Sequence, residues 1–68
     1  MTVQVTVNGQ PREIPAGTTV GHLVGTVTEL ATGVAAAVNG EVVPRRSWAC
    51  TLVHNGDQVE VVTAVQGG

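Results

Sequence analysis

Three Asn-Gly pairs, at positions 8–9, 39–40 and 55–56, border valine-rich runs and most constrain the fold of this chain. Both residues of such a pair tolerate positive φ, which makes Asn-Gly the strongest short-range signal for a tight β-hairpin turn. Before the first pair, "TVQVTV" alternates apolar and polar side chains, as a half-buried strand does. The chain is therefore expected to consist largely of short strands joined by tight turns.

The runs beside these turns predict five strands. The first covers residues 2–7, the second passes through Arg12–Ile14, and "VAAAVNGEVVP" predicts a third and a fourth strand that Pro44 ends. The last strand is "QVEVVTAV". Pro11 cannot donate a ladder hydrogen bond, so the second strand is expected at an edge of the sheet. The first and last strands are the most regularly valine-rich and are expected to lie side by side, parallel and central.

Between the two hairpins the hydrophobic period lengthens to three or four residues, the pattern of an amphipathic helix. The apolar positions are Val20, Leu23, Val24, Val27, Leu30 and Ala31. Thr18 or Thr19 is predicted as the N-cap, and Gly33 suits the position just after the helix. Because Gly21 and Gly25 each cost about 1 kcal/mol of helix propensity relative to Ala, packing against the sheet must hold the helix. These glycines are also expected to let helix and sheet approach closely.

The predicted order is two strands, a helix, two strands and a last strand, which indicates an α+β fold. One amphipathic helix covers one face of a mixed sheet of four or five strands, so the other face must meet solvent or a partner. "RRSWACTLV" is expected to be a loop with a short helical turn. We expect residues 1–66 to form this domain and residues 67–68 to form a flexible tail.

Composition excludes several classes of function. A 68-residue chain forms one domain with a small core, which leaves little volume for a catalytic pocket. Three Arg, no Lys and a net charge of -2 argue against nucleic-acid binding, and Trp48 alone offers no base-stacking platform. No apolar run approaches the roughly 18 residues that span a bilayer, and the start does not read as a signal peptide. The expected location is the cytoplasm.

Candidate catalytic and metal-binding residues are few. Cys50 and His54 are four residues apart, but no carboxylate is obviously placed to orient the imidazole. Cys50 is therefore expected to be a buried small hydrophobe, and His22 a solvated residue on the helix. The Cys and His spacing does not match a zinc site, and no phosphate-binding glycine loop is present. We expect neither an enzyme nor a metal site.

The segment after Pro44 holds two arginines and the only aromatic residue. Arg45 and Arg46 are expected to be solvated, the alternative being contact with a partner. Trp48 is expected to cover one end of the core, the alternative being an interface anchor.

The last strand leads almost directly into Gly67 and Gly68. The Gly68 carboxylate has no side chain beside it, and Gly67 has wide freedom in φ. Val65–Gly68 span about 13 Å when extended, enough to enter a narrow channel in another protein. The carboxylate is ionised at neutral pH and is a poor electrophile. It must be activated, for example as an acyl-adenylate, and a partner must supply the ATP chemistry because this chain carries no ATP-binding motif.

Four pieces of the second half point to a known family: "AVNGEVVPR", the Trp three places after it, "GDQVEVV" and the final "AVQGG". With them the chain resembles the ThiS family of sulfur carriers, which are β-grasp, ubiquitin-like proteins of thiamine thiazole biosynthesis. The first half matches that family in pattern and length more than in motif.

The resemblance implies a co-substrate that partner enzymes modify. A ThiF-type, E1-like adenylyltransferase would consume ATP to adenylate Gly68, with Val65, Gln66 and Gly67 threading its active site. A cysteine desulfurase or rhodanese-type donor would then supply sulfur for a C-terminal thiocarboxylate. A ThiG-type thiazole synthase would accept that sulfur into the thiazole ring of thiamine. No cofactor would be bound by the chain itself, and Cys50 is not part of the family's pattern.

Strand parity predicts a partner surface on the open face of the sheet. If Val59 and Val61 face the helix, the residues between them face outward, and the same holds on the third strand if Ala36 faces inward. The candidate partner surface is Val62, Ala64, Ala35 and Ala37. Small exposed apolar residues form a flat patch that a partner can approach, although scattered exposed alanines can equally have no role.

Three alternatives share parts of this pattern. The small subunit of molybdopterin synthase uses the same fold and tail, but its members are generally longer, with a more aromatic last strand. A protein-conjugating modifier is the second, and the absence of Lys excludes lysine-linked chains on itself. The third is a ligand- or RNA-binding module of the TGS type, which has no use for a free Gly-Gly end. Deletion of Gly67 and Gly68 discriminates, because only a carrier or a modifier loses its function.

Overall fold

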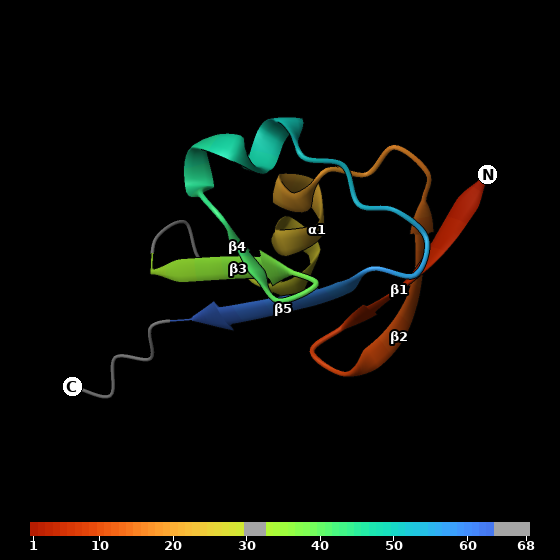
Figure 1. The fold of residues 1–68 in the computed structure, drawn as a ribbon, viewed down its shortest axis with the longest axis horizontal. Helices are drawn as coiled ribbons and strands as arrows, with labels where there is room; N and C mark the ends of the chain where they lie inside the picture. Colours follow the sequence, from red (N-terminus) through yellow and green to blue (C-terminus); the bar gives the residue numbers. More distant parts are fainter. Residues whose placement is uncertain (30–32, 64–68) are drawn as a thin grey trace.

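The computed structural model describes residues 1–29 and 33–63, and Figure 1 shows their arrangement. The strands are β1 (Thr2–Val7), β2 (Gln10–Pro15), β3 (Val34–Val38), β4 (Glu41–Val43) and β5 (Gln58–Thr63). The α-helix is α1 (Val20–Val27), and a 3-10 helix, η1 (Arg45–Cys50), precedes the last strand. The predicted element order is confirmed, including the short helical turn after Pro44.

The five strands form one mixed sheet in the order β2-β1-β5-β3-β4. β5 lies in the middle, parallel to β1 and antiparallel to β3. β2 lies at an edge, where the missing N–H of Pro11 interrupts no further ladder. The predictions of a parallel first and last strand inside the sheet and of an edge position for the second strand are confirmed.

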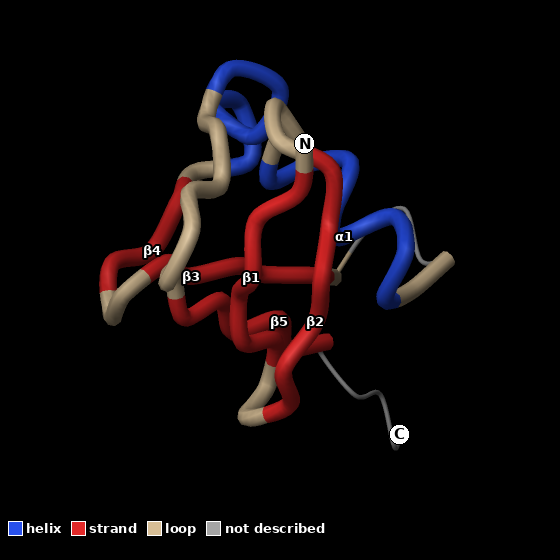
Figure 2. Tube along the Cα trace, turned by 90° about the vertical axis from the view of Figure 1, so that its right-hand side faces the viewer, coloured by secondary structure: helices blue, strands red, loops and turns tan. Residues whose placement is uncertain are grey.

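α1 covers one face of this sheet, while in the described part of the chain no helix lies on the opposite face (Figure 2). The core between sheet and helix consists largely of valines, and Val20, Leu23 and Val59 are its most completely buried large side chains. No helix in the described ranges is long and apolar enough to cross a membrane.

Trp48 covers one end of this core, as predicted. Its side chain is 7% exposed, and its indole Nε1–H donates a hydrogen bond to the Val43 carbonyl at 2.9 Å. The Arg45 guanidinium lies over the outer side of the ring, 4.8 Å from its centroid. η1 is therefore fixed by a buried aromatic side chain and a satisfied polar group.

α1 is shorter than its hydrophobic pattern predicts. Thr19 is the N-cap and accepts a hydrogen bond from the His22 N–H at 3.1 Å, but the helix ends at Val27. Thr28 is extended, with φ -145° and ψ 151°. The Thr28 N–H still donates to the Val24 carbonyl at 3.0 Å, so the helical hydrogen bonds continue to this residue and stop there. Thr26, Val27 and Thr28 are weak helix formers, which favours an early end.

Two further expectations about the helix are corrected. Gly33 does not terminate α1; it has a φ of +71° and comes immediately before β3. Leu30 and Ala31 lie outside the described residues. A side chain at Gly21 would meet the Trp48 Cβ at 3.4 Å, so this glycine admits η1 rather than the sheet. A side chain at Gly25 would meet nothing within 4 Å, so no close approach requires that glycine.

Candidate functional site

The open face of the sheet carries small apolar side chains along β3, β4 and β5. Val62 is 60% exposed and Val42 is 73% exposed, whereas Val61, beside Val62, is 6% exposed. Ala35 is exposed and Ala37 is half-buried. We call Ala35, Ala37, Val42 and Val62 the open-face patch. Together with Glu60 they line a shallow hollow of about 100 Å³.

This arrangement confirms the predicted parity of the strands. Val59 and Val61 face the helix, Glu60 and Val62 face away from it, and Ala36 is buried while Ala35 is exposed. Register makes the patch continuous, because Ala35 lies opposite Val62 and Ala37 lies opposite both Val42 and Glu60. The predicted partner-surface residue Ala64 and the tail residues Val65, Gln66, Gly67 and Gly68 lie outside the described residues.

The side chain of Asn8 holds β5 where β1 ends. Its amide oxygen accepts a hydrogen bond from the Val61 N–H at 2.8 Å, and its amide nitrogen donates to the Val61 carbonyl at 3.1 Å. β1 ends at Val7, before it reaches the level of Val61. Without the Asn8 amide, the main-chain N–H and carbonyl of Val61 that face the β1 side would therefore lose their hydrogen-bond partner. The strand that leads to the tail is thus tied to both of its neighbours.

The other two Asn-Gly turns use their amides in the same way. The Asn39 amide oxygen accepts from the Gln58 N–H at 2.9 Å, at the start of β5. The Asn55 amide oxygen accepts from the Gln4 N–H at 2.8 Å, on β1. The sequence indicated these asparagines only as turn formers, because which strand an amide meets depends on the sheet order.

Val42 is the other residue that the sequence reasoning missed. β4 is only three residues long and reads Glu-Val-Val, so its pattern does not show which valine faces outward. Pairing with β3 decides it, because Val43 lies opposite the buried Ala36 and packs on the core.

The expectation of a buried Cys50 is wrong. Cys50 is exposed at the end of η1, and its Sγ donates to the Ser47 carbonyl at 3.5 Å. It is not buried because Trp48 alone of the residues in η1 points into the core. A carboxylate does lie near His54, since Asp57 Oδ2 is 4.0 Å from His54 Nδ1. The same oxygen accepts from the His54 N–H at 2.8 Å, so Asp57 closes the third turn.

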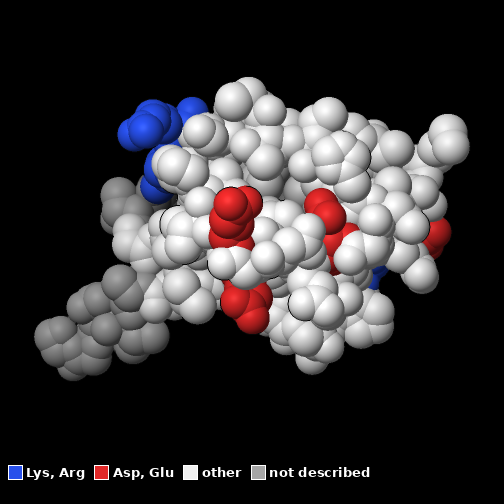
Figure 3. All heavy atoms as spheres, viewed as in Figure 1, with Lys and Arg blue, Asp and Glu red and all other residues white. Residues whose placement is uncertain are grey.

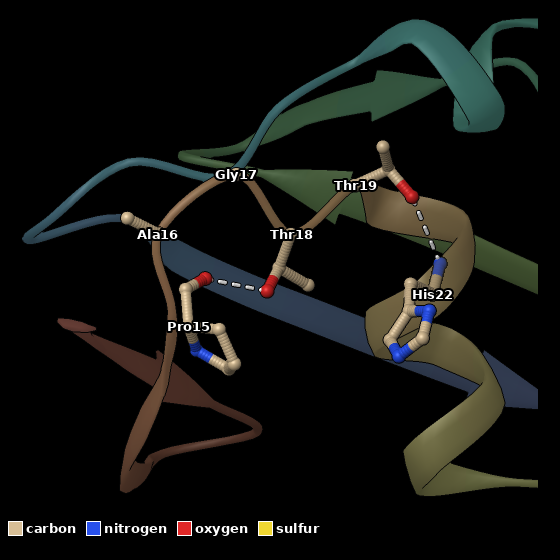
Figure 4. Close-up of a pocket in the computed structure, with 6 residues that line it drawn as sticks. All are labelled: Pro15, Ala16, Gly17, Thr18, Thr19 and His22. Carbon is tan, nitrogen blue, oxygen red and sulfur yellow. Dashed lines mark hydrogen bonds between the residues drawn. The ribbon is translucent and has the colours of Figure 1, made fainter. Parts of the chain in front are cut away.

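A second hollow, of about 360 Å³, lies where β2 leads into α1 (Figure 4). Its hydroxyls are engaged: Thr18 donates to the Pro15 carbonyl at 2.6 Å, and Thr19 caps the helix. His22, on the helix, is exposed as predicted. Within residues 1–29 and 33–63, no group of three or more His, Cys, Asp or Glu side chains could hold a metal ion. Neither this hollow nor the His54 turn assembles catalytic groups.

Fold and site together define a class of protein. The mixed sheet with a central β5, one main helix on one face and an apolar opposite face is the β-grasp, ubiquitin-like fold. The sequence profile of the ThiS family matches residues 5–68. The sulfur carrier protein ThiS of Escherichia coli (strain K12) is 35% identical over 66 residues, which are 97% of this chain and 100% of that protein. The chain belongs to the ThiS family.

Two further proteins are similar over the same length. The crystal structure of the thiamine biosynthesis protein ThiS from Geobacter metallireducens matches with a TM-score of 0.77 and 31% identity, covering 97% of this chain and 100% of that one. A thiazole synthase of Paramagnetospirillum magneticum is 35% identical over 66 residues, which are 97% of this chain but 20% of that protein. The chain is thus a sulfur carrier of thiamine biosynthesis and not an enzyme, as the motifs implied.

Proposed function

We propose that this chain carries sulfur as a thiocarboxylate on Gly68. An adenylyltransferase first joins the Gly68 carboxylate to the α-phosphate of ATP, and pyrophosphate leaves. Hydrosulfide then attacks the acyl carbon, and AMP leaves, so that a C–S bond replaces a C–O bond and no oxidant or reductant is consumed. A persulfide donor instead forms an acyl disulfide as AMP leaves, and a donor thiol then reduces that bond, which releases the thiocarboxylate and leaves a disulfide on the donor. The chain contributes an unhindered carboxylate and the surface that presents it.

The observation that carries this proposal is the family match, which extends through Gly68. β5 supports it, because the strand that precedes the tail lies in the middle of the sheet and is held at Val61 by Asn8. We assign residues 1–66 to the domain and residues 67–68 to the reactive end. Val65, Gln66 and Gly67 thread the partner's active site.

The proposed partners are a ThiF-type adenylyltransferase, a sulfur donor such as a cysteine desulfurase or rhodanese-type protein, and a ThiG-type thiazole synthase. The last is supported by the thiazole synthase relative, in which a stretch similar to this chain is one fifth of the protein. Carrier-like and synthase units therefore occur in one polypeptide there. ATP is consumed by the partner, and this chain binds no cofactor. We place these reactions in the cytoplasm.

The open-face patch is the proposed docking surface for these partners, with Ala64 extending it toward the tail. Val62 and Ala35 of this patch lie opposite each other near the end of β5, so a partner that covers them also meets the chain that follows. Small, flat apolar side chains allow the backbone of a partner to approach closely. Their burial on binding removes apolar surface from water.

Intact mass spectrometry tests the proposed function. The protein is incubated with ATP, hydrosulfide and the adenylyltransferase, and we expect a mass gain equal to the exchange of one oxygen for one sulfur, localised to Gly68. Deletion of Gly67 and Gly68 is expected to abolish the gain without lowering the melting temperature, because both lie beyond β5. Gly67→Ala is the matched variant that keeps the chain length.

The result that contradicts the proposal is equally direct. An adenylyltransferase that is active on its own carrier but leaves Gly68 unmodified here would overturn the carrier mechanism. Sulfur found on Cys50 instead of Gly68 would reassign the site, and Cys50→Ser is the control that identifies it.

A further inference from the structure

Arg45 and Arg46 lie at the end of the sheet from which the chain leaves β5. Register fixes this position, because Val43 of β4 lies opposite Ala36 of β3, and Ala36 lies opposite Val61 of β5. β4 and β5 run in the same direction, since both are antiparallel to β3. Arg45 follows Val43 by two residues, just as the last residue of β5 follows Val61 by two.

The charges on this face are segregated. Glu60 lies opposite Ala37, so this acid sits on the open face, level with the first half of β5. Glu41 lies at the same level, but alternation with the outward-facing Val42 places it on the other side of β4. Figure 3 shows acidic atoms over the middle of this view and at its right-hand edge, while most of the basic atoms gather at the upper left corner next to η1 and a small basic area shows at the lower right. Two of the three arginines are in η1, in a chain of net charge -2. The open-face patch therefore has an acid beside it at Glu60 and a basic end, and the basic end is the one at which β5 ends.

Arg45 is held against a buried side chain. Arg45 lies over Trp48, 4.8 Å from the ring centroid, and Trp48 is anchored by its bond to the Val43 carbonyl. Arg46 follows in the same helix and is exposed. A guanidinium held in this way loses less side-chain entropy on binding than a free one and can bind a carboxylate through two parallel hydrogen bonds.

We propose that Arg45 and Arg46 contact acidic side chains around the opening through which the adenylyltransferase receives the tail, an inference that rests on the proposed function. A net charge of -2 and only three arginines in the chain argue against nucleic acid as their ligand. The pair orients docking, so that the tail meets the opening while the patch is covered.

The test compares charge reversals of equal size at two exposed arginines. Arg46→Glu changes the proposed contact without removing the Arg45–Trp48 stack, and Arg12→Glu changes the net charge equally on β2, at the sheet edge. We expect Arg46→Glu to raise the KM of the adenylyltransferase for the carrier about tenfold at low salt, chiefly by slowing association, and Arg12→Glu to leave it nearly unchanged. Arg46→Lys should have a KM close to that of the wild type, because it keeps the positive charge.

Ionic strength provides the second measurement. Raising it from about 0.01 M to about 0.15 M shortens the Debye length from about 30 Å to about 8 Å, so the difference between Arg46→Glu and the wild type should shrink. Equal KM values for Arg46→Glu and Arg12→Glu, with a wild-type protein that gains sulfur normally, would overturn this inference alone. A wild-type protein that gains no sulfur would overturn the proposed function and this inference with it.

Discussion

The two faces of β5 are built from similar residues and are used differently. Val59 and Val61 point toward α1 and are 1% and 6% exposed, whereas Val62, on the same strand, is 60% exposed. Burial of a valine side chain stabilises a fold by roughly 1.5–3 kcal/mol, and an exposed valine forgoes most of that. The helix-covered valines therefore account for the stability of this small domain. The exposed ones are grouped in the open-face patch, the proposed docking surface.

The largest expected effect is on the free energy of unfolding, and it is measured by making the same substitution on each face of β5. Val59→Ala should lower the free energy of unfolding by about 2–3 kcal/mol, because it removes buried methyl groups and leaves a cavity in a small core. Val62→Ala should lower it by less than about 0.5 kcal/mol, since its methyl groups already contact water. Urea unfolding followed by circular dichroism measures both. Equal losses would show that the two faces do not differ in their contribution to stability.

A smaller loss of stability is expected from a substitution at Asn8, the residue after β1 that bonds to Val61 of β5. In Asn8→Gly, the glycine can adopt the observed φ of 52°, but both side-chain hydrogen bonds to Val61 are removed. We expect a loss of about 1–2 kcal/mol in the free energy of unfolding, because these are partly buried main-chain groups. Hydrogen exchange should also become faster at the Val61 amide.

Asn8→Asp is the matched variant for this prediction. It retains the acceptor for the Val61 N–H but cannot donate to the Val61 carbonyl when ionised. Its stability should fall between those of the wild type and Asn8→Gly. Wild-type stability in Asn8→Gly would mean that water replaces the amide and that Asn8 acts only as a turn residue.

The sequence predicted the elements that follow from local pattern, and it failed where tertiary contacts decide. Valine alternation and Asn-Gly pairs located the strands and turns, and Pro11 located the edge. The end of α1 was missed because a hydrophobic period does not register the weak helix propensity of Thr26, Val27 and Thr28. Cys50 was expected to be buried from its residue type, but its exposure depends on how Trp48 orients η1.

The candidate site shows the same division. The outward parity of Val62 and Ala35 follows from alternation alone and is confirmed. The outward orientation of Val42 and the bonds of Asn8 to Val61 depend on which strands are neighbours, so no local sequence pattern predicts them. The basic corner at Arg45 also emerges only once β4 and β5 are known to run in the same direction.

The smallest expected effect on stability is the most informative about function. Val62→Asp should change the free energy of unfolding by less than about 0.5 kcal/mol, because the side chain is exposed. It should nevertheless raise the KM of the adenylyltransferase about tenfold, since a carboxylate at the centre of the patch must lose water when the partner covers it. Thiocarboxylate formation, followed by mass spectrometry at varied carrier concentration, measures the change.

Ala16→Asp controls for the added charge. Ala16 is exposed in the turn after β2, outside the patch, and gains the same carboxylate. If both variants raise KM equally, the effect belongs to net charge, and the patch is not part of the interface. If Val62→Asp alone raises it while both proteins stay folded, the exposed valine is retained for binding. The two faces of β5 then have different roles: one contributes to folding and the other to presentation of the tail.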